Sequence, residues 1–147
     1  YLEACLSHPT SMIALHAEAR EVATALRQLA ETEVTSGITL NPRTQPRDVA
    51  DLIERVALVQ IMTIEPGSQG RPFQPELLAK LDLVRAINPA AILIVDGGAS
   101  SGTIEAIVRY RPDYIAVGSA LTRAESPADA WNTLNRLVSV TLQTTTE

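Results

Sequence analysis

The stretch Ala91-Ile92-Leu93-Ile94-Val95-Asp96-Gly97-Gly98-Ala99-Ser100 decides the fold of this chain. Its first five residues are apolar, and the run ends on a carboxylate followed by two glycines. An unbroken apolar run of this length is typical of a strand buried on both faces, as in a parallel sheet covered by helices. An acidic residue at the carboxyl end of such a strand lies where α/β barrels and open parallel sheets carry their chemistry. The alternative is that Asp96 only caps the following helix.

Length and composition predict a single domain over residues 1–147. Of the 147 residues, 46% are hydrophobic and 20% are charged, which is ordinary for a domain with an apolar core. The net charge of -5 argues against nucleic acid or an anionic membrane surface as the main partner. Because the single cysteine, Cys5, cannot form an internal disulfide, we expect a buried thiol and a reducing, cytoplasmic setting.

Apolar runs alternate with amphipathic segments along the whole chain. Periodicity predicts strands at 12–16, 37–42, 57–62, 91–96 and 114–117. It predicts helices at 19–31, 47–56, 75–87, 101–110 and 128–140, with Trp131 as a packing residue of the last one. Consecutive parallel strands need a crossover connection, so this alternation predicts a parallel sheet whose strands are adjacent in chain order.

Glycines follow the last two predicted strands, at Gly97-Gly98 and at Gly118-Ser119. Their backbone N–H groups, close to helix starts, are suited to holding a phosphate dianion. A phosphate site after the final two strands is also common in (β/α)8 barrels. The sequence therefore predicts a phosphate site at this rim.

His16 and Asp96 end two different predicted strands and fall on the same rim. An imidazole and a carboxylate that converge can bind a divalent metal, although two ligands are too few by themselves. A histidine in this position is otherwise a hydrogen-bonded structural residue. The residues alone do not decide between a metal ligand and a structural histidine.

Five motifs, in family order and with family-like spacing, resemble the ribulose-phosphate 3-epimerase family. They are Leu15-His16-Ala17-Glu18-Ala19, Leu40-Asn41-Pro42, Met62-Thr63-Ile64-Glu65-Pro66-Gly67, Val95-Asp96-Gly97-Gly98 and Val117-Gly118-Ser119-Ala120. The resemblance implies an α/β fold of the (β/α)8 TIM-barrel type. It also implies metal-dependent epimerisation at C3, which interconverts D-ribulose 5-phosphate and D-xylulose 5-phosphate through an enediolate.

The resemblance also assigns roles to individual residues. Asp96 is implied to be a catalytic acid/base group and a metal ligand, and His16 a second ligand of a Zn, Fe, Mn or Co ion. The implied substrate-binding residues are His16, Met62, Gly67, Ser68, Gln69, Gly70, Gly97, Gly98, Gly118 and Ser119.

Two departures from the family pattern bear on function. The family loop usually continues with an aromatic residue and Gly-Gly-Gln, whereas here Ser68-Gln69-Gly70-Arg71 follows Gly67. Arg71 brings a charge that meets either a phosphate or only solvent. The chain also begins at Tyr1 and holds about five of eight βα units. We therefore expect a partial barrel, the C-terminal part of the family fold, that is inactive alone and lacks the second catalytic aspartate.

Two other functions remain open from the sequence. One is 3-epimerisation of a different ketose phosphate, such as a ketohexose 6-phosphate, because the altered loop touches the substrate. The other is a non-catalytic relative that binds sugar phosphates. We expect a homo-oligomer that binds a small sugar phosphate and neither nucleic acid nor membrane.

Overall fold

Five strands form one parallel sheet in the computed structural model, which describes residues 2–68 and 70–144. The strands are β1 (Met12–His16), β2 (Thr35–Leu40), β3 (Leu58–Met62), β4 (Ile92–Asp96) and β5 (Tyr114–Ala116). They pair in the order β1-β2-β3-β4-β5, and every pairing is parallel. The predicted α/β fold, with parallel strands adjacent in chain order, is therefore confirmed.

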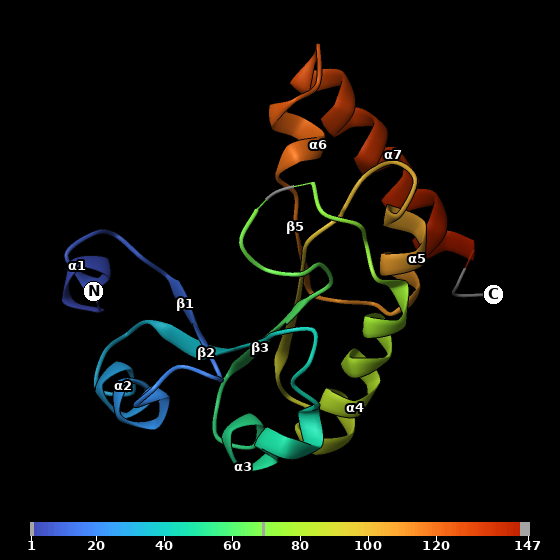
Figure 1. Ribbon diagram of the computed structural model, residues 1–147. Coiled ribbons are helices and arrows are strands. Elements are labelled where there is room, and N and C mark those ends of the chain that lie inside the picture. Colours follow the sequence, from blue (N-terminus) through green and yellow to red (C-terminus); the bar gives the residue numbers. More distant parts are fainter. Residues whose placement is uncertain (1, 69, 145–147) are drawn as a thin grey trace.

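Four helices connect consecutive strands and lie along the outer side of the curved sheet (Figure 1). They are α2 (Val22–Leu29), α3 (Ala50–Ile53), α4 (Ala79–Ile87) and α5 (Ile104–Arg109). α1 (Leu2–Leu6) precedes β1, and α6 (Ser119–Thr122) and α7 (Pro127–Thr144) follow β5. Two 3-10 turns, η1 (Pro46–Val49) and η2 (Pro75–Leu78), precede α3 and α4. Both turns begin at a proline, whose missing N–H would have had no partner in a first helical turn. The short helix α6 was not predicted.

The core lies between the sheet and these outer helices. Successive residues of a strand point to opposite faces, and Leu93 and Val95 of β4 face the helices with at most 1% of their surface exposed. Equally buried residues of β2 and β3 lie beside them, and α3, α4 and α5 supply Ile53, Leu81, Val84 and Ile107. This buried layer explains why the strands are so apolar.

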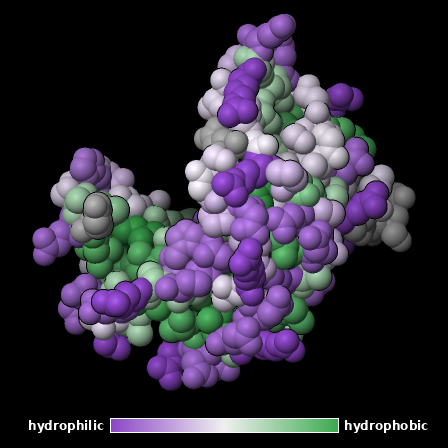
Figure 2. All heavy atoms as spheres, viewed as in Figure 1, coloured by the Kyte–Doolittle hydropathy of each residue, from purple (hydrophilic) through white to green (hydrophobic). Residues whose placement is uncertain are grey.

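The opposite, inner face of the sheet is only partly covered, and this corrects the expectation that β4 is buried on both faces. Ile92, Ile94 and Asp96 are of intermediate exposure, in alternation with the buried residues. Five strands do not close a barrel, so their inner side lines a hollow. Figure 2 shows this hollow between the N-terminal elements and the α6–α7 end of the molecule.

Two further expectations about packing are wrong. Cys5 is exposed, because α1 buries none of its residues. Trp131 is 51% exposed on α7, where its ring borders a shallow apolar hollow instead of entering the core. In both cases the residue type favours burial, but it does not show whether a neighbouring element covers the side chain.

Candidate active site

Asp96 is the last residue of β4. Thr63, which directly follows β3, bonds its backbone, and Gln60 of β3 bonds its side chain. The backbone N–H of Thr63 donates to the carbonyl oxygen of Asp96 (2.8 Å), and Gln60 Nε2 donates to Asp96 Oδ2 (2.9 Å). Burial raises the pKa of the Asp96 carboxyl above its ordinary value, and the charge of His16 partly opposes this. A carboxylate with a raised pKa is a better base than a free aspartate, so Asp96 is suited to proton transfer.

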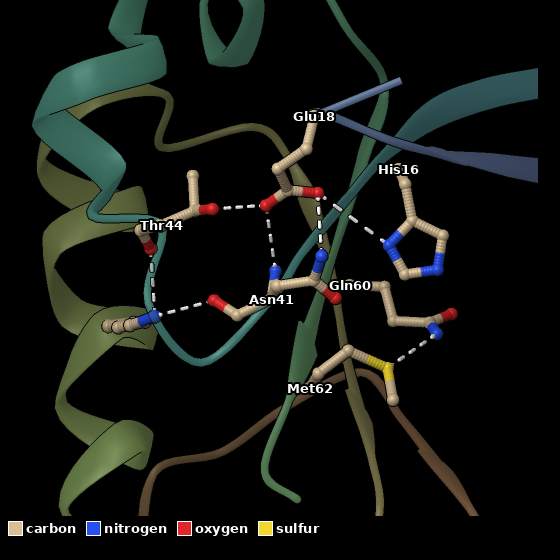
Figure 3. A network of polar contacts seen from close by, with 7 residues as sticks. His16, Glu18, Asn41, Thr44, Gln60 and Met62 are labelled. Carbon is tan, nitrogen blue, oxygen red and sulfur yellow. Dashed lines mark hydrogen bonds and ion pairs between the residues drawn. The ribbon is translucent and has the colours of Figure 1, made fainter. Parts of the chain in front are cut away.

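Gln60 also connects this carboxylate to Met62. Its Nε2 lies 3.8 Å from Met62 Sδ (Figure 3). Met62 is the register partner of Asp96 on the neighbouring strand. The structure therefore places Met62 beside Asp96, with Gln60 contacting both, while substrate contact by Met62 stays a prediction. Among the described residues, the Asp96 carboxylate accepts no hydrogen bond from the start of α5, which argues against Asp96 as a helix cap.

His16 ends β1 and faces Glu18. The distance from His16 Nδ1 to Glu18 Oε2 is 3.7 Å, and half of the histidine side chain is exposed. Glu18 Oε1 accepts hydrogen bonds from the backbone N–H of Asn41 (3.2 Å) and from the Thr44 hydroxyl, while Oε2 accepts one from Asn41 Nδ2 (3.0 Å). Figure 3 shows that Glu18 joins β1 to the loop after β2 in this way.

The hydrogen bonds to Glu18 also set its ionisation. Burial tends to raise the pKa of Glu18, but the bonds from Thr44 and from backbone N–H groups, together with the charge of His16, outweigh it. The pKa therefore lies below its ordinary value. Glu18 is an anion at neutral pH and supplies a fixed negative charge beside the histidine.

Lys80 of α4 holds the same loop from the opposite side. It is the only lysine in the sequence and is 3% exposed. Its Nζ donates to the backbone carbonyls of Asn41 (3.0 Å), Pro42 (2.7 Å) and Thr44 (2.8 Å). Burial lowers the pKa of Lys80, and Glu18 partly restores it. The loop is thus fixed between a carboxylate and an ammonium group.

A small cavity of about 90 Å³ lies next to Asp96, at the carboxyl ends of β4 and β5. It is lined by Ile64, Gly70, Asp96, Gly97, Gly98, Ala99, Ala116, Gly118 and Ser119. The structure therefore brings the four residues of the predicted phosphate site together with the predicted acid/base group. In the described part of the chain, no group accepts a hydrogen bond from the N–H of Gly98 or of Ser119, and both residues line the cavity.

Glycine is required at one side of this cavity. Gly98 has a φ of 70°, and a Cβ there would lie 2.9 Å from Phe73 Cβ. A side chain would therefore be strained and would collide with the loop that follows β3.

Only one of the predicted substrate-binding residues in the loop after Met62 lines this cavity in the described part of the chain. Gly70 lines the cavity, but Gly67 and Ser68 are exposed and are not among its lining residues. Gln69 lies outside the described residues. Substrate contacts by Gly67, Ser68 and Gln69 stay predictions.

The donor set for a divalent ion is incomplete in this chain. Across residues 2–68 and 70–144, no group of three or more His, Cys, Asp or Glu side chains is arranged to hold a metal. His16 and Asp96 are close enough for the charge of one to change the pKa of the other, and both are donor types that Zn and Mn accept. They fit as part of a coordination sphere and not as a whole one.

Residues 1–122 match the model of the ribulose-phosphate 3 epimerase family. This chain belongs to that family.

Two relatives show the extent of the match. Ribulose-phosphate 3-epimerase from Schizosaccharomyces pombe is 30% identical over 139 residues, which are 94% of this chain and 61% of the relative. The cytoplasmic isoform of ribulose-phosphate 3-epimerase from Oryza sativa is 33% identical over 105 residues, 69% of this chain and 46% of the relative. The chain spans about half the length of the curated relatives it matches.

A solved structure confirms the fold class. The 3-hexulose-6-phosphate synthase from Salmonella typhimurium has a TM-score of 0.76 and 18% identity, over 95% of this chain and 67% of that chain. At this identity the likeness concerns the fold alone. It agrees with the α/β class of the five-stranded parallel sheet.

Sequence reasoning missed Glu18, Thr44, Gln60 and Lys80. Gln60 interrupts an otherwise apolar strand, and Lys80 falls on the buried side of α4, so each was a detectable polar exception. Glu18 stands two residues after His16 in a family motif. Thr44 had no signal, because its role depends on the course of the loop.

The described residues include no helix that is long and apolar enough to cross a membrane.

Proposed function

We propose that the protein that carries this chain epimerises D-ribulose 5-phosphate at C3 to D-xylulose 5-phosphate, and that Asp96 transfers one of the two protons. The observation that carries this proposal is the position of Asp96, whose pKa is raised, beside a glycine-lined cavity with free N–H groups. Membership of the epimerase family and the names of the relatives support the substrate.

In this proposal the phosphate lies on the N–H groups of Gly98 and Ser119. Asp96 then removes the C3 proton as a general base, and Gln60 holds Oδ2 so that Oδ1 is directed to the substrate. Inversion requires a second acid on the opposite face of C3. We propose that this second group comes from outside the five βα units described here.

We further propose that Asp96 and His16 each supply one ligand to a divalent ion. When bound, such an ion stabilises negative charge on the oxygen next to C3 as the proton leaves. Glu18 Oε2 lies 3.7 Å from His16 Nδ1, so we assign Nε2, the nitrogen away from this carboxylate, as the one that would coordinate the ion. His16→Asn and Asp96→Asn should each lower the affinity for a divalent ion at least about tenfold. Unchanged affinity in His16→Asn would limit His16 to a structural role.

A larger ketose phosphate is the second candidate substrate. A further cavity of about 340 Å³ shares four lining residues with the small one, so the phosphate of a ligand with one more carbon has space to lie further toward the solvent. Comparing kcat/KM for a pentulose 5-phosphate and a ketohexose 6-phosphate decides between them. Binding of both without turnover would instead favour the non-catalytic relative. A homo-oligomeric state and a cytoplasmic location stay predictions.

The decisive experiment follows deuterium from C3 of the substrate into water. Asp96→Asn is nearly isosteric, so phosphate binding should persist while exchange falls by about 10² to 10⁴-fold, the usual contribution of a positioned base. Asp51→Asn, an exposed carboxylate on α3, is the matched control. Exchange at the unmutated rate in both reaction directions would show that Asp96 is not the proton carrier.

A further inference from the structure

Two arginines line the larger cavity beside the phosphate-binding glycines. This cavity of about 340 Å³ is bordered by Arg71 and Arg123 and shares Gly98 and Ser119 with the small cavity at Asp96. None of its lining residues is Asp or Glu. A ligand phosphate on the N–H groups of Gly98 and Ser119 would therefore lie between the two cavities, with positive charge on its outer side.

The loop after β3 contacts both guanidinium groups. Arg123 follows α6, and its Nη1 would lie 3.1 Å from a Cβ placed on Gly70, so the guanidinium rests against the loop backbone. Arg71 Nε donates to Ser68 Oγ (3.0 Å). Arg123 comes from the segment after β5 and Arg71 from the loop after β3, and both border one opening.

Neither arginine forms an ion pair with a carboxylate in the described part of the chain. Two other arginines form such pairs. Arg85 Nη1 lies 3.1 Å from Asp82 Oδ1, and Arg47 Nε lies 3.8 Å from Asp48 Oδ1. Two cations at one opening repel each other unless an anion lies between them. The planar guanidinium matches the oxygens of a phosphate and binds them with charge-assisted hydrogen bonds.

We propose that Arg71 and Arg123 form a clamp that binds the ligand's phosphate from the solvent side, opposite the N–H groups of Gly98 and Ser119. The clamp makes the site specific for dianionic sugar phosphates over unphosphorylated sugars. This proposal rests on the proposed function, because it names how the same site recognises its substrate.

The test measures binding of inorganic phosphate and of D-ribulose 5-phosphate by calorimetry in the protein that carries this chain. Arg123→Gln and Arg71→Gln should each weaken both affinities about tenfold, as expected for a lost charge-assisted hydrogen bond at a partly exposed site. The slope of log affinity against log salt should also become shallower. Arg47→Gln, at an exposed arginine away from the cavity, is the matched control.

Turnover provides a second readout. Loss of a phosphate contact that is equal in ground state and transition state raises KM with little change in kcat. Arg123→Lys keeps the charge and should recover part of the affinity, which a purely structural defect would not show. Circular dichroism of each variant checks that it is folded.

The outcomes separate the clamp from the proposed function. Unchanged affinities and salt slope in both glutamine variants would overturn the clamp, whatever the activity of the protein. Weakened phosphate binding in Arg123→Gln, together with full C3 exchange in Asp96→Asn, would support the clamp and reject the role of Asp96.

Discussion

Glu18 shows how much one side chain does at this rim. Its carboxylate accepts hydrogen bonds from the Asn41 backbone, the Asn41 amide and the Thr44 hydroxyl, and it lies 3.7 Å from His16. No other described residue links the end of β1 to the loop after β2 with comparable contacts. The ionisation of Glu18 is therefore coupled to the position of both strand ends.

The lowered pKa of Glu18 predicts how stability depends on pH. A carboxyl whose pKa is lower in the folded chain stabilises the fold above its unfolded pKa, and this contribution is lost as pH falls through the folded pKa. The ordinary value is 4.5. Glu18→Gln should therefore lower the free energy of unfolding at pH 7 by about 1 kcal/mol, after allowance for partial exposure.

Urea unfolding of wild type and Glu18→Gln at several pH values checks this. The difference between the two should persist at pH 5 to 7 and shrink as pH falls below 4.5. Glu31→Gln, at an exposed carboxylate, is the control. A difference that grows toward acid pH would contradict the assignment.

The strands β2 and β3 depend on a close approach at Gly37. A Cβ on this residue would lie 1.9 Å from the carbonyl oxygen of Leu58 and 2.5 Å from Leu58 Cγ. Leu58 is fully buried and cannot move aside. The side chain of one strand thus occupies the space that a side chain of its neighbour would need.

We predict that Gly37→Ala destabilises the chain by about 1 to 3 kcal/mol or more, because overpacking forces backbone shifts. Gly102→Ala is the matched control, since a Cβ there meets nothing closer than 3.9 Å. Thermal unfolding of the two variants gives the comparison. Equal melting temperatures for Gly37→Ala and wild type would show that the two strands separate easily.

The whole molecule is an open sheet with two free edges among its described residues. β1 pairs only with β2, and β5 pairs only with β4. The inner face between these edges is partly exposed, and Tyr114 on β5 is 51% exposed. Unpaired edges next to apolar surface favour pairing with another chain.

We predict that the isolated 147-residue chain self-associates in a concentration-dependent manner. Tyr114→Lys should weaken this association, because a charge on an edge strand opposes strand pairing. Leu83→Lys, at a residue on α4 that is 50% exposed, should leave it unchanged. Sedimentation velocity over a range of concentrations measures both, and a monomer with a sharp, concentration-independent unfolding transition would refute the prediction.

The sequence by itself determined the parallel order of the strands and the gathering of Asp96 with the glycines. Both follow from local periodicity, because strictly alternating strands and helices put all carboxyl ends on one rim. The motifs were also sufficient for the family, which the matched residues 1–122 confirm.

Only the tertiary structure decided which side chains meet at that rim and which face of the sheet stays open. Gln60 and Asp96 are 36 residues apart, and Lys80 and Asn41 are 39 apart. Such contacts depend on strand register and loop course, which local patterns do not encode. Ile92 and Ile94 are as apolar as Leu93 and Val95, yet only the latter pair is buried. Apolar character makes burial favourable, but burial itself requires a neighbouring element, and five strands leave the inner face without one.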